Sequence, residues 1–253
     1  MIAIRSSEEI GLLRESGRIV SEALDLAERL IRPGVTTGDL DSEIEAMIRD
    51  SGGTPEFKGF HGYPASICAS VNEVVVHGIP GKRELREGDI IGIDVGVRKD
   101  GYVGDGARTF PVGEIRDEAR RLMDVTYQAL TNGLAAVSDG VHLSDLSSAV
   151  QTTAESHGYS VVRELAGHGV GREMHEAPEV PNYGPPGRGP VLKAGMVLAV
   201  EPMVNMGGPA VRTLPDGWTV VTADASLSAH FEHTVVVTGS GIDILTLSSA
   251  ATE

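Results

Sequence analysis

A stretch of ten residues occurs twice in this chain and limits the folds that the chain can adopt. The stretch from Leu85 to Asp94 is echoed in the second half by the stretch from Leu192 to Glu201. Each copy has Leu, a cation and Gly at matching places, followed by an apolar, strand-like run that ends in a carboxylate. Such an acid is costly to desolvate unless a cation or hydrogen-bond donors meet it. The two strand-end acids therefore predict a metal site between two halves.

A second echo supports the duplication. The segment 34–44 recurs as 140–150, with Gly, Val, Asp, Leu and an aliphatic residue in the same order and at nearly the same offset. Two copies with so long a period indicate a pseudosymmetric domain rather than a repeat array. We expect one domain over residues 1–253, with halves of about 1–115 and 116–253.

Composition excludes several classes of protein. The net charge of -15 argues against bulk nucleic-acid binding, because no basic field meets the phosphates. Cys68 is the only cysteine, so no intrachain disulfide forms. The start at Met1 lacks the pattern of a signal peptide, and no apolar run approaches the ~20 residues that span a bilayer. We expect a cytoplasmic chain without membrane contact.

Local patterns predict an α+β chain in which antiparallel strands are covered by helices. Apolar spacing and capping residues predict four helices. They begin at Ser6–Glu9, at Thr36–Thr37, at Arg116 (ending at Val137) and at Ser144 (ending at Ser156). Strands are expected at 74–76, at 90–97 with a return strand from Tyr102, from 161, at 197–204, at 218–222 and at 231–237. Asp100-Gly101 predicts a hairpin turn, and the Pro/Gly-rich residues 176–190 predict a loop.

Four acids and one histidine make up a candidate metal-ligand set. Asp94 and Asp105 flank the predicted hairpin, Glu201 and Glu232 occupy the second half, and His168 lies between two glycines. These ligands suit Mn²⁺, Fe²⁺, Co²⁺ or Mg²⁺ better than a structural tetrahedral Zn²⁺. So many acids exceed the charge of one divalent ion, which favours a two-metal centre.

Each of these residues also has a plain structural interpretation. Asp105 between Gly104 and Gly106 is typical of a turn, Glu232 beside His233 is typical of an edge strand, and His168 of a loop. Asp94 and Glu201 are hardest to explain structurally, since each interrupts an apolar run at the equivalent place.

At these residues the chain resembles the type I methionine aminopeptidases, of the pita-bread fold, over essentially its whole length. The motifs that carry the resemblance are Gly167–Gly171 with His175, Val180, Asn182 and Tyr183; Ile93–Gly96; Asp105; Glu201–Met203; and Phe231–Thr234. Two departures, Leu165 and Met174, stand where the family usually has other side chains. They bear on the shape of the substrate pocket.

The resemblance implies a catalytic domain that removes the N-terminal methionine of nascent polypeptides and prefers a small second residue. It implies two divalent ions (Mn²⁺, Fe²⁺ or Co²⁺, with Zn²⁺ as a further candidate) held by Asp94, Asp105, His168, Glu201 and Glu232. A hydroxide bridging the metals would attack the scissile carbonyl. Glu201 would also shuttle a proton, while His77 and His175 would bind the substrate backbone and the developing oxyanion.

By the same resemblance, the methionine pocket includes aromatic and sulfur-containing side chains. These are Phe60, Tyr63, Cys68, Met174 and Trp218, with His77 and His175 beside them. Contacts between sulfur and aromatic rings suit recognition of a thioether. The cluster of aromatics near Phe60 is equally typical of a core strand.

Two other functions remain open at this point. An Xaa-Pro aminopeptidase or prolidase shares the ligands but usually adds an N-terminal domain, which 253 residues cannot hold. A non-catalytic pita-bread module that binds peptides or ribosomal partners would lose metal ligands, and all five are present. We expect a monomer that makes transient contact with the ribosome.

Overall fold

The computed structural model describes residues 2–247, and its first helices begin where the sequence predicts. Helix α1 (Ser7–Leu30) starts with a capping box in which Ser6 and Glu9 each accept a hydrogen bond from the other's backbone N–H. Thr36 and Asp39 do the same for α2 (Thr37–Asp50). Such reciprocal caps satisfy backbone donors that the first turn otherwise leaves free. The two predicted helix starts are confirmed.

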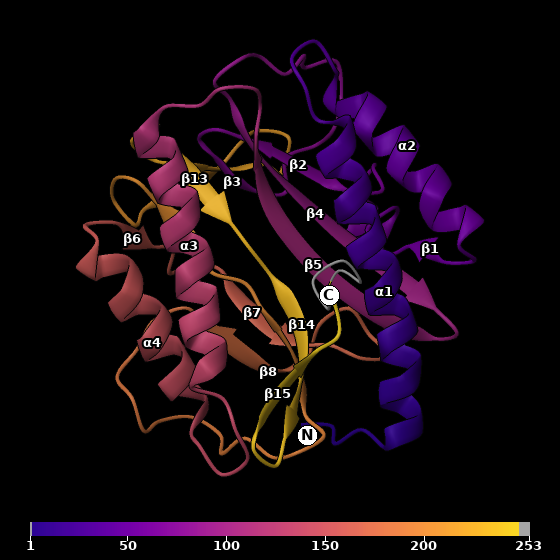
Figure 1. The fold of residues 1–253 in the computed structure, drawn as a ribbon, viewed down its shortest axis with the longest axis vertical. Coiled ribbons are helices and arrows are strands. Elements are labelled where there is room, and N and C mark those ends of the chain that lie inside the picture. The colour runs from indigo at the N-terminus through magenta and orange to yellow at the C-terminus, as the bar shows by residue number, and fades with distance from the viewer. Residues whose placement is uncertain (1, 248–253) are drawn as a thin grey trace.

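The helices form two pairs that flank the strands. Helix α1 packs against α2, and α3 (Asp117–Ala135) packs against α4 (Leu143–Ser156). Figure 1 shows the pairs on opposite sides of the molecule, with the C-terminal strands running between them. One hydrophobic cluster lies under each pair, because each helix buries one apolar stripe.

The strands of the described residues pair antiparallel throughout, as predicted, and hydrogen bonding divides them into four sheets. Their order is β1-β4-β2 with β5 on β4, β13-β10-β6, β11-β12-β3, and β15-β14-β9-β7-β8. In chain order the strands are β1 (Thr54–Pro55), β2 (Cys68–Val71), β3 (Val74–Val76), β4 (Ile90–Lys99), β5 (Tyr102–Pro111), β6 (Ser160–Val161), β7 (Ala166–Gly169), β8 (Glu176–Pro181), β9 (Val197–Val200), β10 (Met203–Asn205), β11 (Val211–Thr213), β12 (Val220–Thr222), β13 (Ser228–His230), β14 (His233–Thr238) and β15 (Gly241–Ile244). A short 3₁₀ helix, η1, spans Phe60–Gly62.

The predicted hairpin joins β4 and β5. Asp100 and Gly101 both have positive φ, 48° and 81°, as a type I′ turn requires. The register from this turn pairs Asp94 with Ala107 and Asp105 with Gly96. The hairpin therefore carries both predicted acids in one continuous ladder.

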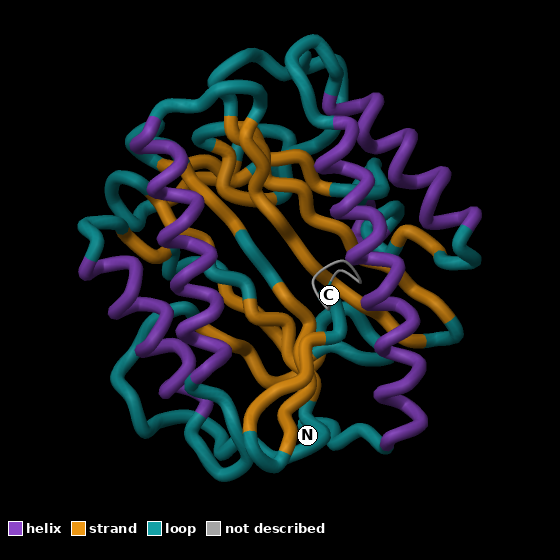
Figure 2. Tube along the Cα trace, in the orientation of Figure 1, coloured by secondary structure: helices purple, strands orange, loops and turns teal. Residues whose placement is uncertain are grey.

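Several predicted boundaries are wrong. The strand expected over 218–222 begins only at Val220, as β12, and the helix expected to end at Val137 ends at Ala135. Residues 176–181 form strand β8 rather than loop; β8 lies at a sheet edge, where the missing N–H of proline is tolerated. The strand expected over 197–204 divides into β9 and β10, because Pro202 cannot continue the ladder. The strand expected over 231–237 begins only at His233, so Glu232 lies in a break between β13 and β14. Figure 2 shows this break as a loop segment interrupting the central strands.

The two segments on either side of residue 116 share an order of elements. Helices α1 and α2 precede β4 and β5, and helices α3 and α4 precede β9 and β14. This order is the one expected from the echoed sequence. The halves 1–115 and 116–253 of a single domain stay a prediction.

Candidate metal centre and substrate pocket

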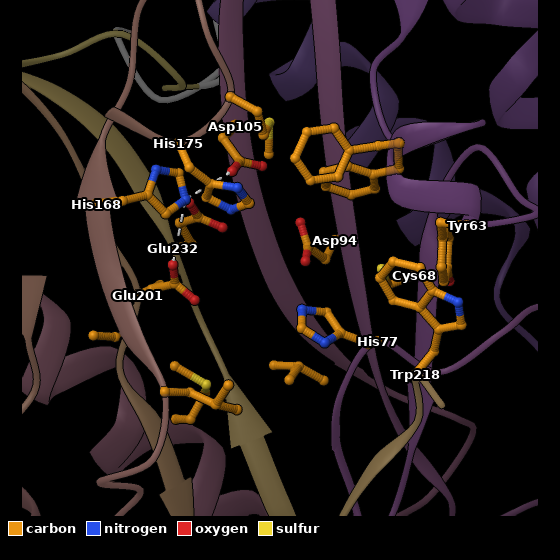
Figure 3. A pocket seen from close by; sticks show the side chains of 17 residues that line it. Tyr63, Cys68, His77, Asp94, Asp105, His168, His175, Glu201, Trp218 and Glu232 are labelled. Atoms are coloured by element: carbon orange, nitrogen blue, oxygen red, sulfur yellow. Dashed lines mark ion pairs between the residues drawn. The ribbon is translucent and has the colours of Figure 1, made fainter. Parts of the chain in front are cut away.

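One cavity of about 200 Å³ gathers the predicted site residues, and Figure 3 shows it from close by. All twelve candidates line it: Phe60, Tyr63, Cys68, His77, Asp94, Asp105, His168, Met174, His175, Glu201, Trp218 and Glu232. Phe57, Val76, Leu165, Ala166 and Met203 complete the lining. Asp105, His168, His175, Glu201 and Glu232 lie on one side of the cavity and Tyr63, Cys68 and Trp218 on the other, with Asp94 and His77 between them.

The alternation of side chains along a strand places Asp94 and Asp105 on the same face of the β4–β5 hairpin. Residues 94 and 96 of β4 share a face because side chains alternate along a strand. Asp105 lies opposite Gly96 and so points to that same face as Asp94. Gly96 has a packing role as well, since a Cβ there would lie 2.6 Å from the ring of Phe57. The glycine lets an aromatic wall approach the strand that carries the acids.

His168 needs its flanking glycines for close backbone packing. A Cβ at Gly167 would lie 2.3 Å from the carbonyl oxygen of Ala199, and one at Gly169 equally close to that of Ala177. The His168 ring contacts the Gly169 carbonyl through Nδ1 at 3.0 Å, a contact in which Nδ1 carries the proton. Nε2 then faces the acids as the free ligand atom, an arrangement typical of metal-binding histidines.

Two threonines hold Glu232 against the first hairpin. The Thr234 hydroxyl donates to the Asp105 carbonyl at 2.7 Å and accepts the Asp105 N–H at 3.1 Å. Thr109 makes the same pair of bonds with the backbone of His230, at 2.8 and 3.0 Å. Between them, the Glu232 N–H donates to Ala107. This seam fixes Glu232 beside Asp105 although the two belong to distant segments.

Glu201 occupies the break between β9 and β10. Its carbonyl accepts a 3.0 Å hydrogen bond from the side chain of Asn182, which is fully buried, in place of a ladder bond. Its Oε1 atom lies 3.6 Å from Nε2 of His168. The side chain of Glu201 is 14% exposed, so it reaches the cavity while its backbone stays anchored.

The donor atoms fit a divalent metal ion. Ligand atoms of Asp105, His168 and Glu232 lie within 4.8 Å of one another, and all three residues are buried. Oδ1 of Asp94, Oδ1 of Asp105 and Oε1 of Glu232 are buried with no hydrogen-bond partner among the described residues. Buried carboxylate oxygens without partners are rare unless something meets them. Figure 3 places Asp94 apart from the other acids, toward Cys68 and His77.

The pKa shifts of these groups also indicate a site for a divalent cation. Burial, and then the charges of Asp105 and Glu201, raise the pKa of Asp94 and of Glu232 well above the usual range. Burial opposes a charged His168, but the carboxylate of Asp105, 3.6 Å from its Nε2 atom, and the charge of Glu201 outweigh this and raise its pKa to about 9. Crowded acids around one imidazole favour a divalent cation, which binds by displacing protons.

The two outer histidines border the cavity from different segments. His77 follows β3 in the left-handed region, with φ of 58°, while His175 lies at the exposed rim, 4.3 Å from His168 between ring centroids. Burial lowers the pKa of His77, and partial burial followed by the charge of His168 lowers that of His175. Both imidazoles are therefore neutral near pH 7.

The apolar wall is held together by ring contacts and buried hydrogen bonds. The rings of Tyr63 and Trp218 meet edge to face at 5.1 Å. The Tyr63 hydroxyl shares its one proton between the carbonyls of Ile67 and Gly78, at 3.1 and 3.0 Å, which leaves its ring face to the cavity. Burial, and then the charge of Asp94, raise the pKa of the Cys68 thiol, so it stays protonated. Cys68 and Met174 are 4% and 3% exposed and behave as apolar sulfur side chains.

Sequence reasoning missed Phe57, Val76, Ala166 and Met203 in the lining, and His230 beside Glu201. Phe57 belongs to the noted aromatic cluster, so a signal existed for it. His230 carries no local signal, because its place beside Glu201 arises from the break after β9 and from the seam with Thr109.

Comparisons with known proteins agree with the geometry. The model of metallopeptidase family M24 matches residues 11–239. Methionine aminopeptidase 1 of Bacillus subtilis is 51% identical over 97% of this chain and 99% of its own length. The crystal structure of methionine aminopeptidase from Rickettsia prowazekii has a TM-score of 0.96 and 43% identity, covering 98% of this chain and 100% of that one.

A more distant structure separates fold from activity. Prolidase from Pyrococcus furiosus has a TM-score of 0.80 at 24% identity, and the match covers 97% of this chain but 66% of the prolidase. At that identity the likeness concerns the fold alone. The predicted resemblance and the pita-bread, α+β fold class are confirmed. The chain belongs to metallopeptidase family M24 and, within it, to the methionine aminopeptidases.

Proposed function

We propose that this chain removes the N-terminal methionine from nascent proteins and peptides whose second residue is small. The observation that carries the proposal is a single cavity in which buried carboxylates surround His168 beside an apolar wall of aromatic and sulfur-containing side chains. The first feature suits metal-assisted hydrolysis and the second suits a thioether.

Asp94, Asp105, His168, Glu201 and Glu232 would hold two divalent ions. Four carboxylates exceed the charge of one such ion, and the unpartnered oxygens of Asp94, Asp105 and Glu232 support the pair. When bound, divalent ions lower the pKa of water and polarise a carbonyl group. Mn²⁺, Fe²⁺ and Co²⁺ suit this mixture of carboxylate and imidazole, with Zn²⁺ as a further candidate.

The protein's own groups handle the proton and the substrate. Glu201 reaches the cavity from a break in the sheet, so its carboxylate can take a proton from water and return it to the leaving amine. His77 and His175, both neutral, can donate hydrogen bonds to the scissile carbonyl as negative charge develops on its oxygen. The methionine side chain would lie among Phe60, Tyr63, Cys68, Met174 and Trp218.

The second residue of the substrate would lie at the narrow mouth of the cavity. His175 packs against Phe60, with 5.4 Å between their ring centroids, so these two side chains narrow the mouth beyond the scissile bond. A large second side chain would have to displace one of them. This is the physical basis for selectivity toward small residues such as alanine.

A peptide panel tests the activity and separates it from the alternatives. Peptides beginning Met-Ala, Met-Leu and Ala-Pro are incubated with enzyme loaded with Mn²⁺, Fe²⁺, Co²⁺ or Zn²⁺, and an Asp105→Asn variant serves as the control. We expect free methionine from Met-Ala with a kcat/KM at least about tenfold above that of Met-Leu, roughly 1.4 kcal/mol. Equal values for the two would remove the size selectivity. Preferential cleavage of Ala-Pro would indicate the prolidase function, and no cleavage of any peptide would indicate a binding module.

The site of action follows from the substrate. We propose that the enzyme acts in the cytoplasm, as a monomer in transient contact with the ribosome. The place of action is supported by the substrate, since methionine at the N-terminus is present on newly made chains. No helix among the described residues is long and apolar enough to cross a membrane. Sedimentation of the purified chain, alone and with ribosomes, measures both properties.

A further inference from the structure

His230 lies behind Glu201, at a place that the proposed chemistry leaves without a role. Its side chain is buried, and its Nε2 atom lies 3.6 Å from Oε2 of Glu201. Nε2 has no hydrogen-bond partner among the described residues. An unsatisfied buried polar atom is destabilising, so its position calls for an explanation. His230 is not among the residues that line the cavity, so it lies behind the cavity wall.

The backbone of His230 is fixed on both sides. Thr109 accepts its N–H and donates to its carbonyl, and the β10–β13 register pairs it with Met203. Met203 begins the strand that resumes after Glu201 and Pro202. The imidazole is therefore held at a set distance from the break that contains Glu201.

Glu201 is flanked by two imidazoles, one at each carboxylate oxygen. Oε1 lies 3.6 Å from Nε2 of His168, and Oε2 lies 3.6 Å from Nε2 of His230. The second distance is longer than a hydrogen bond of about 2.9 Å, yet it leaves no room for a water between the two atoms. A shift of about 0.4–0.7 Å brings the two atoms into the range of a direct N–H···O hydrogen bond.

We propose that His230 is a positioning residue for Glu201, with its Nε2–H donating to Oε2 so that Oε1 is presented to the cavity. This inference rests on the proposed function of Glu201. A glutamate outside a strand ladder can rotate about three side-chain bonds, and a bond at Oε2 fixes the plane of the carboxylate. Misplacing a catalytic group by about 1 Å can cost about 10²-fold in rate, and losing a partner of a metal ligand typically costs 10–100-fold in metal affinity or activity.

Two substitutions separate positioning from packing. His230→Leu replaces the imidazole with an apolar side chain of moderate size that has no donor. His230→Gln replaces it with a side chain that still has an N–H donor. We expect His230→Leu to lower kcat for a Met-Ala peptide about 10–100-fold and to weaken metal binding in calorimetry, with KM within about threefold of wild type. His230→Gln should recover kcat to within about threefold of wild type. Ser228→Ala is the matched control, because Ser228 shares the strand and bonds to Asn205 rather than to Glu201.

The protonated nitrogen gives a readout independent of turnover. Nitrogen NMR of the histidine side chains in Zn²⁺-loaded wild-type enzyme should show the proton of His230 on Nε2. An unprotonated Nε2 would overturn the proposal, since His230 would then be an acceptor or a ligand. Wild-type kcat and metal affinity in a folded His230→Leu variant would also overturn it, as would equal losses in the Leu and Gln variants. Failure of the wild-type enzyme to release methionine would instead overturn the proposed function, because calorimetry and NMR need no turnover.

Discussion

Asp94 and Glu201 end the two echoed stretches of sequence, but the structure gives them different backbone settings. Asp94 lies inside β4, paired with Cys68 of β2 on one side and with Ala107 of β5 on the other. Glu201 lies in the gap between β9 and β10, where Asn182 binds its carbonyl. Asp94 is fixed by hydrogen bonding to a strand on each side, whereas Glu201 extends from the break between β9 and β10.

The difference shows how a duplicated pattern can carry two kinds of chemistry. A carboxylate held by strands on both sides suits a fixed ligand. A carboxylate with one more methylene, at a break made by Pro202, can move between metal binding and proton transfer. The two stretches supply equivalent acids, and the proline after one of them makes the acids unequal.

Removing the metal should have the largest effect, and it tests whether Asp94 and Glu201 act through a metal at all. Chelation should abolish methionine release, and Mn²⁺, Fe²⁺ or Co²⁺ should restore it, because the unpartnered oxygens of Asp94, Asp105 and Glu232 need a cation. Rates are measured before and after chelation, with elemental analysis of each sample. Full activity in metal-free enzyme would mean that neither acid acts through a metal.

A change in the apolar wall should have an intermediate effect and leave both acids unaffected. Met174→Ala removes a buried side chain from the cavity, which typically costs ~1–3 kcal/mol. KM for a Met-Ala peptide should rise roughly 5- to 150-fold while metal content stays constant. Met206→Ala is the control, since Met206 packs against a different hydrophobic cluster. An unchanged KM in Met174→Ala would place this residue outside the methionine pocket.

The smallest effect concerns the loop that carries Phe60 and Tyr63. Glu45 on α2 holds this loop by accepting hydrogen bonds from Ser66 at 2.7 Å and Lys58 at 2.6 Å. These bonds, with that to Lys58 the strongest, lower the pKa of Glu45 to about 2. Glu45→Gln should lower the free energy of unfolding by about 1 kcal/mol at pH 7 and change kcat little.

The pH dependence of that loss has a defined sign. Because the folded pKa lies below the usual 4.5, the contribution of Glu45 is present above pH 4.5 and fades as the pH falls toward 2. In urea unfolding at pH 7, 4.5 and 3.5, the difference between wild type and Glu45→Gln should therefore be largest at pH 7 and begin to narrow at pH 3.5. Glu43→Gln, exposed on the same helix, is the control. A constant difference across this range would show that the charge of Glu45 does not hold the loop.

The parts of the fold predicted from sequence are those set by neighbours in the chain. Ser6 with Glu9 marks a helix start, and Asp100-Gly101 marks a hairpin, because each signal acts over a few residues. The edge strand β8 was missed, since its prolines suggest a loop until a neighbouring strand supplies the edge. Pairing with β7 makes these residues a strand, and no pattern within residues 176–190 indicates that pairing.

In the candidate site, too, the residues predicted from sequence are those marked by local patterns. Hairpin parity and the flanking glycines pointed to Asp94, Asp105 and His168 from the sequence alone. The seam that places Glu232, and the position of His230, depend on contacts between residues 121 to 129 positions apart, which no local pattern encodes. The roles of the individual residues stay predictions.

The most direct test of the unequal acids is a metal titration of two variants in parallel. Metal content and kcat for a Met-Ala peptide are measured for Asp94→Asn and Glu201→Gln as the concentration of Mn²⁺ or Co²⁺ rises. Asp94→Asn should bind metal more weakly and recover part of its activity at high metal. Glu201→Gln should retain much of its metal and stay about 10²–10⁴-fold below wild type in kcat. A metal-saturated Glu201→Gln enzyme turning over near the wild-type rate would contradict the proton-transfer role and make Glu201 a ligand only.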